Sequence, residues 1–437
     1  MASEDARYRQ SSQFRLWSFS RSELASLREK ANALARASIS ERLSSTSSSS
    51  TTANKNNHDR SASTSNANTP DPEGSAGGAS FRLPEFLTVA EEALMVTFYT
   101  SQLLGAGEAA GMSDEVCATA AAFFRRFYIT NSIMTYPPQD MMFVALFFGC
   151  KAEGHFPRIG DFLNMGALSS IKKQPEEILA GEFLLCQGIR FAFDVKHPFR
   201  ALIGAGMELR RLGGIPEDRI RAAESRAKQI LRFSSLITDA YFHYTPSQIM
   251  LAALSHADRG LAERLIHNTF HLPTAPIKVE SGADTPVDGV PKENNARKDR
   301  ANEDKAAIIG QHIRDRVLGT IEACRDMLSH EMPERSREHW QTKEIYQDLV
   351  LPVKKKLKKC RDPDRSNLVA LQRARREKAL KKSGGSEDGG PDDRATAGTK
   401  GDDAGIFGGD LVQRDSKRRK VAPGQGPALD DPFGGPL

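Results

Sequence analysis

The stretch that decides the fold is Phe124–Lys151, which reads FRRFYITNSIMTYPPQDMMFVALFFGCK. Pro137 and Pro138 stand near its centre, and proline is tolerated in the first turn of a helix because its missing N–H would have had no partner there. The residues that follow, Met141–Phe148, are apolar on every side of a helix. A helix of that kind must be wrapped by other helices. The stretch therefore predicts a buried central helix.

Further helices are predicted on both sides of this one. Thr88 and Glu91 have capping-box spacing ahead of an apolar stripe, and Ser113 is a cap residue ahead of another. Pro175 opens a further helical segment. No alternation of apolar and polar residues persists long enough to predict a strand. We expect residues 81–195 to form a cluster of five helices.

A second copy of this cluster is indicated by an internal repeat. The sequence YPPQDMM at 136–142 is echoed by YTPSQIM at 244–250, and both are followed two residues later by Ala-Leu. Repeated sequence at a fixed offset is typical of repeated structural units. We expect a second helical module over residues 196–330, with one long helix from Pro216 to about Phe242. A polar, disordered loop is expected at 274–305.

The flanks differ from the two modules in composition. Residues 1–37 predict a short segment and a helix, whereas the Ser/Thr-rich residues 38–80 bury too little apolar surface to order and are expected to be disordered. A basic C-terminal helix is predicted at 336–382, because residues 353–382 hold thirteen Lys and Arg against three acids. The tail 383–437 is expected to be disordered. It carries a basic island that fits a nuclear import signal, made of Lys417, Arg418, Arg419 and Lys420.

Composition excludes several classes of protein. Of the 437 residues 39% are apolar and the net charge is +5, which fits one or two compact cores. The first residues, MASEDARYRQ, hold no apolar stretch of a secretory signal, and no run approaches the roughly 20 residues of a membrane span. The five cysteines show no CxxC spacing. We therefore expect reduced cysteines in an intracellular protein, with neither zinc nor any other cofactor.

Motifs of the common enzyme classes are absent from the sequence. There is no phosphate-binding loop of the GxxxxGK[ST] type, no kinase HRD or DFG motif and no nucleophile elbow. His330 and Glu331 begin an HExxH pattern, but Glu334 stands where the second histidine would be. We therefore expect a protein that is not an enzyme.

The central stretch resembles the heart of a cyclin box. The two-module organisation and YTPSQI at 244–249 resemble the second box of cyclins of the H type, and SSQFRLWSFS at 11–20 resembles the segment before their N-terminal helix. The resemblance covers residues 8–37 and 81–348, without the insertions. It implies an all-α fold of two consecutive five-helix cyclin-box modules with flanking N- and C-terminal helices.

The resemblance also implies two charged contact residues. In cyclins a lysine at the end of the third helix and a glutamate on the fifth helix grip a kinase, and the matching residues here are Lys151 and Glu182. A lysine offers three donors to carbonyl groups, and a carboxylate accepts from free N–H groups at a helix N-terminus. Outside this context either would usually be a solvated charge. At the corresponding offsets the second module has Arg259 and Val290, so only the first module is expected to grip a kinase.

Four aromatic residues are candidates for apolar contacts to the same kinase, although aromatic residues at helical spacing more often belong to a core. They are Phe148, Phe183, Phe191 and Phe193. Trp17 and Phe14 are expected to pack the N-terminal helix onto the modules. No residue is expected to be catalytic or to bind a metal.

The resemblance implies the regulatory subunit of the CDK-activating kinase, which is also the kinase of TFIIH in RNA polymerase II transcription. The implied partners are a cyclin-dependent kinase, a RING-finger assembly factor and the TFIIH core, in the nucleus, without a membrane and without direct nucleic-acid binding. Three alternatives stay open: another transcriptional cyclin of the C, K or T type, a TFIIB-like factor whose two cyclin-fold modules bind DNA, and a helical scaffold that activates nothing.

Overall fold

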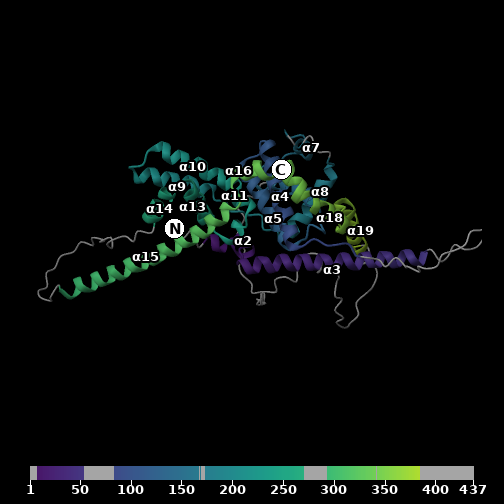
Figure 1. Ribbon diagram of the computed structural model, residues 1–437, viewed down its shortest axis with the longest axis horizontal. Helices are drawn as coiled ribbons and strands as arrows, with labels where there is room; N and C mark the ends of the chain where they lie inside the picture. The colour runs from purple at the N-terminus through teal and green to yellow at the C-terminus, as the bar shows by residue number, and fades with distance from the viewer. Residues whose placement is uncertain are drawn as a thin grey trace, which may run out of the picture. The chain divides into compact units, whose positions relative to one another are not determined.

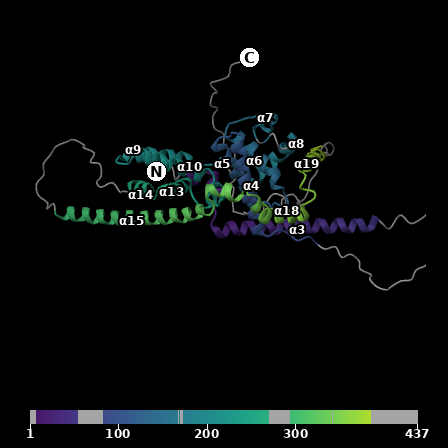
Figure 2. The same ribbon diagram turned by 45° about the horizontal axis from the view of Figure 1, so that its top comes forward.

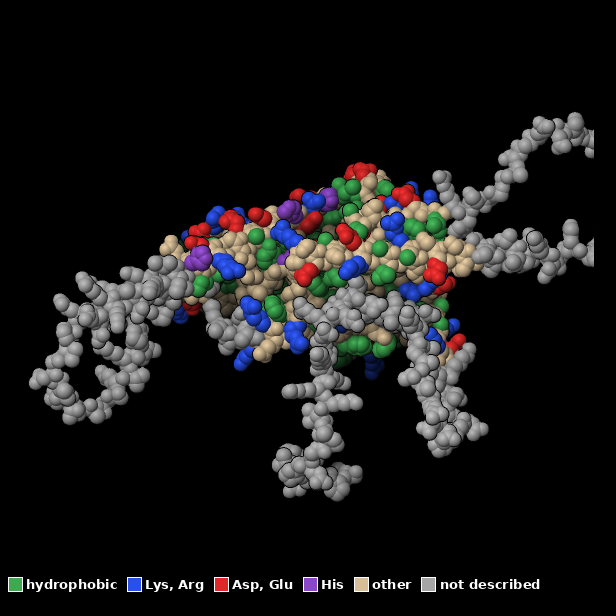
Figure 3. Space-filling view, turned by 90° about the horizontal axis from the view of Figure 1, so that it is seen from below, with side chains coloured by type: hydrophobic (Ala, Val, Ile, Leu, Met, Phe, Trp, Pro, Cys, Tyr) green, Lys and Arg blue, Asp and Glu red, His purple; other side chains and the backbone are tan. Residues whose placement is uncertain are grey.

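The computed structural model describes residues 7–53, 83–166, 168, 173–269, 293–340 and 342–383. Within these ranges the regular secondary structure is helical and there is no strand, which confirms the all-α prediction (Figure 1). On the face drawn in Figure 3, acidic and basic side chains are interspersed, with apolar side chains between them. None of the helices in the described part combines the length and apolar character that a membrane span requires. Nor do three or more potential metal ligands among His, Cys, Asp and Glu meet in these ranges.

The first module is built around one buried helix, as the sequence predicts. Its helices are α4 (Val89–Ala109), α5 (Asp114–Thr130), α6 (Pro138–Ala152), α7 (Ile159–Leu163) and α8 (Pro175–Gly188). The central helix α6, labelled in Figure 2, contacts α4, α5 and α8. Every side chain from Met141 to Phe147 is buried. The approach to α5 is close, because a Cβ added at Gly149 would lie 2.9 Å from the Cβ of Ala120.

The second module repeats this plan. Its helices are α9 (Phe199–Leu212), α10 (Glu217–Arg232), α11 (Ser234–Ile237), α12 (Ala240–His243), α13 (Pro246–Ala257), α14 (Arg259–Thr269) and α15 (Glu293–Ser329). Here α13 takes the place of α6 and contacts α9, α10, α14 and α15. It begins with a capping box between Thr245 and Gln248. The predicted repeat is therefore a structural repeat.

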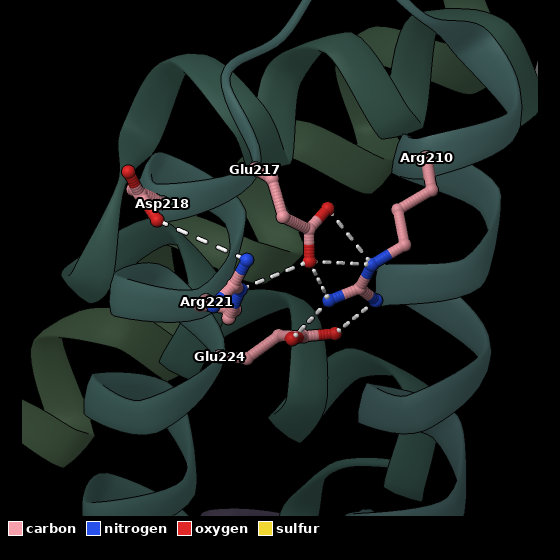
Figure 4. A network of polar contacts seen from close by, with 5 residues as sticks. All are labelled: Arg210, Glu217, Asp218, Arg221 and Glu224. Carbon is pink, nitrogen blue, oxygen red and sulfur yellow. Dashed lines mark hydrogen bonds and ion pairs between the residues drawn. The ribbon is translucent and has the colours of Figure 1, made fainter.

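A charged network joins α9 to α10 on the surface of the second module (Figure 4). The guanidinium of Arg210 donates to Glu217 at 3.0 Å and to Glu224 at 2.8 Å, and Arg221 donates to Glu217 at 3.2 Å. The carboxylate of Glu224 occupies the space beside Gly206 that a Cβ would fill. The glycine thus lets an acid on one helix meet a base on the other.

The single long helix expected from Pro216 to about Phe242 is wrong, because the chain breaks after Arg232 and again after Ile237. The hydroxyls of Ser235 and Thr238 donate to the backbone carbonyls of Leu231 and Ser234. Such bonds compete with regular helix geometry. The second break brings Asp239 into a junction, where it accepts hydrogen bonds from Arg28 at 2.7 Å and from Arg125 at 2.5 Å.

Two expected disordered segments are partly helical. Helix α3 runs from Arg21 to Ala53, so disorder over 38–80 is wrong for residues 38–53. Ile39 is fully buried, and Arg42 forms an ion pair of 2.7 Å with the buried Asp362, so distant parts of the chain stabilise this extension. Likewise α15 starts at Glu293, inside the loop expected at 274–305. Once the rest of α15 has formed, it can extend toward its N-terminus through the Ala, Glu, Lys and Arg residues of 293–305, which are good helix formers.

The remaining residues of both segments, 54–80 and 274–292, lie outside the described residues. So does the tail beyond Ser383, including Lys417, Arg418, Arg419 and Lys420.

The continuous basic helix predicted at 336–382 is also wrong. The segment consists of α16 (Pro333–Arg335), η2 (Ser336–Trp340), α17 (Lys343–Ile345), η3 (Tyr346–Val350), α18 (Leu351–Cys360) and α19 (Leu368–Ser383), in which the two η segments are π-helical turns. Pro352 and Pro363 cannot donate the backbone bond that a continuing helix needs. Two of the lysines are held by the first module. Lys356 pairs with Glu91 at 3.0 Å, and the ammonium of Lys354 lies 5.8 Å from the ring centroid of Phe98.

The N-terminal segment reaches both modules, through α2 (Ser12–Trp17) and the residues after it. The side-chain oxygen of Gln13 accepts from the backbone N–H of Lys196 at 2.5 Å, in the connection between the modules. The backbone N–H of Phe19 donates to the carbonyl of Phe242 in the second module at 2.8 Å. Trp17 is buried. The segment thus packs where the two modules meet.

Candidate functional site

The structure brings the two predicted charged residues together. Lys151 lies in the last turn of α6 and Glu182 lies in α8, and the Nζ and Oε1 atoms are 2.6 Å apart. The helices can approach here because a glycine precedes the glutamate. A Cβ added at Gly181 would lie 2.5 Å from a methyl group of Val144 on α6.

This ion pair stands at the edge of the core rather than within it. The side chain of Lys151 is 31% exposed and that of Glu182 is 19% exposed. The ammonium also lies 4.2 Å from the ring centroid of Phe147, a cation–π contact. A pair this accessible to water contributes about 0–1 kcal/mol to stability. The ammonium has three donors, and its hydrogen bond to Glu182 uses one.

The four candidate phenylalanines form one row beside the pair. The ring centroids of Phe183 and Phe191 are 6.2 Å apart, those of Phe191 and Phe193 are 6.1 Å apart, and those of Phe193 and Phe148 are 5.2 Å apart. We call these four residues the aromatic row.

Three members of the row face solvent. Phe183 is 57% exposed, Phe191 is 55% exposed and Phe193 is 40% exposed, whereas Phe148 is half-buried and packs on Phe123. Adjoining exposed apolar side chains rimmed by charge are typical of an interaction site. The row and the ion pair therefore form one continuous candidate surface on α6, α8 and the turn after α8.

The turn that carries Phe191 has an unusual backbone. Arg190 and Phe191 both have positive φ, 57° and 54°, in the left-handed region that non-glycine residues rarely adopt. Their N–H groups donate to the carbonyls of Gln187 and Cys186, the two bonds of a Schellman motif, in which the position of Arg190 usually holds glycine. Each left-handed non-glycine residue costs roughly 1–2 kcal/mol. Contacts elsewhere must offset that cost.

Several residues of this surface escape prediction from sequence. The sequence predicts Phe147 only as part of a buried helix, yet its ring also contacts the ammonium of Lys151. The left-handed turn carries no glycine or asparagine that would indicate it. Phe156, in the loop after α6, is 78% exposed, and its only signal is an apolar residue among polar neighbours.

The second module has a weaker counterpart of the ion pair. Arg259 pairs with Glu263 at 2.8 Å and approaches Glu322 of α15 at 3.9 Å. Val290, at the simple sequence offset from Glu182, lies outside the described residues. The offset fails because the connection between α14 and α15 is longer than that between α7 and α8. The side chain of Arg259 is 60% exposed, about twice the exposed fraction of Lys151.

Comparison with known proteins identifies a matching domain family and a similar chain of known structure. A model of the cyclin C-terminal domain matches residues 197–329. A chain in a structure of the CAK complex of Chaetomium thermophilum bound to ATP-gamma-S is 57% identical, with a TM-score of 0.69, over 89% of this chain and 100% of that one.

Two similar curated proteins are cyclins. Cyclin CCL1 of Saccharomyces cerevisiae is 28% identical over 270 residues, which are 61% of this chain and 62% of that protein. Cyclin-H of Xenopus laevis is 30% identical over 175 residues, which are 39% of this chain and 54% of that protein. The chain thus spans between about half and two thirds of the length of these relatives.

The fold, the domain match and the relatives together define the class, and the chain belongs to the cyclin family. The two modules built around α6 and α13 are its two cyclin boxes. Within that family, its similarity is to cyclins of the H type.

Proposed function

We propose that the chain is the regulatory subunit of a cyclin-dependent kinase, which it binds through Lys151, Glu182 and the aromatic row and thereby activates. The observation that carries the proposal is the 2.6 Å pair at the edge of an exposed row of rings. A rigid apolar surface bordered by one cation and one anion fits a partner helix whose end presents free backbone groups.

The chemistry of the pair suits that role. The ammonium of Lys151 has donors left for the carbonyl groups of a partner, and the carboxylate of Glu182 can accept from the free N–H groups at a helix N-terminus. A kinase is active only when its C helix is placed inward, so that the glutamate on that helix pairs with the catalytic lysine. Binding energy from the aromatic row supplies that placement, and this chain contributes no chemistry of its own.

The relatives support a wider setting for this role. The similar chain of Chaetomium thermophilum belongs to a CAK complex, and we propose that this chain has the same role in a CDK-activating kinase. A RING-finger assembly factor would be the third subunit, and the TFIIH core would receive the complex in the nucleus during RNA polymerase II transcription. Relatives named cyclins favour this role over a TFIIB-like DNA-binding factor.

Truncation of the glutamate tests the proposal. We expect Glu182→Ala to weaken kinase binding by roughly 2–5 kcal/mol, because it leaves Lys151 without its partner and removes an acceptor from the interface. Binding is measured by calorimetry with the purified kinase, and activation by phosphorylation of a C-terminal repeat peptide.

The matched control is Glu263→Ala, which breaks the exposed pair with Arg259 in the second module. We expect this variant to bind and activate normally. The proposal is refuted if Glu182→Ala and Glu263→Ala activate the kinase equally well at matched concentrations and with matched melting temperatures.

A further inference from the structure

The aromatic row depends on a turn that its own sequence does not favour. Arg190 and Phe191 are both left-handed, with φ of 57° and 54°, and the chain then leads directly to Phe193. If this turn relaxed to an ordinary conformation, Phe191 would leave its place between Phe183 and Phe193. Contacts that hold the turn therefore control the row.

Those contacts come from the N-terminal segment. The guanidinium carbon of Arg190 lies 5.5 Å from the ring centroid of Trp17, and that of Arg126 on α5 lies 5.4 Å from the same centroid. Arg126 also donates to the carbonyl of Ala192 at 3.2 Å, at the far end of the turn. One indole thus contacts both arginines that touch the turn.

The two arginines near the turn need the indole ring because they lack carboxylate partners in the part of the chain that the structure describes. Arg126 is buried and Arg190 is half-buried, and neither forms an ion pair with any described carboxylate. A desolvated guanidinium without a carboxylate needs another source of negative potential, and the face of an indole is the best that a side-chain ring offers. The indole N–H of Trp17 has no hydrogen-bond partner among the described residues. Packing and the two cations therefore fix its ring.

We propose that Trp17 is a positioning residue for the kinase-binding surface: through Arg190 and Arg126 it holds the left-handed turn that presents Phe191. The N-terminal segment 11–20 then sets the affinity of the aromatic row without touching the partner. This inference rests on the proposed function, because the row must be the surface that the kinase contacts.

The test uses the full chain with Arg190→Met, which keeps a long side chain and removes the cation, and Trp17→Leu, which keeps an apolar side chain and removes the ring. Lys354→Met is the matched control, because its ammonium lies 5.8 Å from the ring of Phe98, far along the chain from this turn. Hydrogen exchange of residues 189–193 reports on the turn in the free chain, and calorimetry reports on kinase binding.

We expect amide exchange at 189–193 to become at least tenfold faster in both variants, kinase binding to weaken about tenfold, and neither to change in Lys354→Met. Unchanged exchange in Arg190→Met overturns the inference, and so does faster exchange with unchanged kinase binding. Because Arg190 is half-buried, its variant decides the question even if Trp17→Leu fails to fold.

Two further variants separate this inference from the proposed function. If Phe183→Ala and Phe193→Ala leave kinase binding unchanged, the assignment of the kinase surface fails. If they weaken kinase binding and Arg190→Met does not, the positioning role of Trp17 fails and the surface stands.

Discussion

At the scale of single residues, the candidate surface depends on the absence of a side chain at Gly181 as much as on the charges of Lys151 and Glu182. Gly181 lets α8 lie so close to α6 that Glu182 meets Lys151. The aromatic row has no such requirement, because three of its members, Phe183, Phe191 and Phe193, face solvent. Close packing in an interior tolerates little added volume. The geometry of the ion pair is therefore sensitive to a single methyl group.

We expect Gly181→Ala to lower the free energy of unfolding by about 1–3 kcal/mol, because the new methyl group would overlap Val144. Kinase activation should fall as well, since α8 moves away from α6. Urea unfolding and the kinase assay measure the two effects. Gly204→Ala in α9 is the control, because a Cβ there meets nothing within 4 Å, and it should stabilise the chain by up to about 1 kcal/mol. Equal stabilities of the two variants would contradict the explanation.

At the scale of elements, the helices at the two ends of the described chain support each other. Helix α3 continues past residue 37 because Ile39 is buried and Arg42 reaches Asp362, in the connection between α18 and α19. Asp362 also accepts from the backbone N–H groups of Asp364 and Arg365, and its own N–H donates to Met134 in the first module. The C-terminal segments are thereby tied to the first cyclin box.

Arg42→Ala should destabilise the chain by about 1–3 kcal/mol, because the carboxylate of Asp362 is almost fully buried and would lose its charged donor. Thermal unfolding followed by circular dichroism measures the change. Lys30→Ala, an exposed lysine on the same helix, should have little effect. Equal melting temperatures of Arg42→Ala and Lys30→Ala would contradict a stabilising role for the Arg42–Asp362 pair.

At the scale of the whole described chain, a series of polar side chains, of which Thr119 and Tyr241 are buried, joins the two cyclin boxes. The hydroxyl of Thr119 donates to Glu153 at 2.5 Å, so its oxygen accepts from the Nε2–H of His197 at 2.8 Å. The Nδ1 atom of that ring then accepts from the hydroxyl of Tyr241 at 3.0 Å. The neutral imidazole satisfies both neighbours, whereas a protonated ring would require the hydroxyl of Tyr241 to turn and accept from the second N–H. Burial lowers the pKa of His197 to about 3.

The free energy of unfolding of the chain should therefore decrease as the pH is lowered. The unfolded state takes up a proton near pH 6.5 and the folded state only near pH 3, so His197 stabilises the fold above pH 6.5 and loses that contribution as the pH falls. By pH 5 the loss from this residue should reach roughly 2 kcal/mol. Urea unfolding at pH 7 and pH 5 measures it against His197→Gln, which keeps a donor and an acceptor but cannot take up the proton. Identical pH dependence in both proteins would count against a buried neutral imidazole.

The sequence alone determined the class of fold and the location of the central helices. Caps at Thr88, Ser113 and Thr245, together with an apolar run that only surrounding helices could cover, act over a few residues and can be read directly. Lys151 and Glu182 were identified by resemblance and the four phenylalanines as candidate apolar contacts; the structure brings the two charges together and the four rings into one row. Sequence periodicity has no means of showing that α6 and α8 would meet there.

Only the tertiary structure decided how far α3 extends, where the helix after Pro216 breaks and why Phe191 projects from a left-handed turn. The extension of α3 depends on Ile39 and Arg42 reaching residues far along the chain, and the turn is held by Arg126 and Trp17 from other elements. These contacts outweigh local preference because burial and charge pairing act between segments that the chain brings together only when it folds. Local patterns therefore fix the elements, whereas contacts between distant residues fix their limits and the shape of the candidate surface.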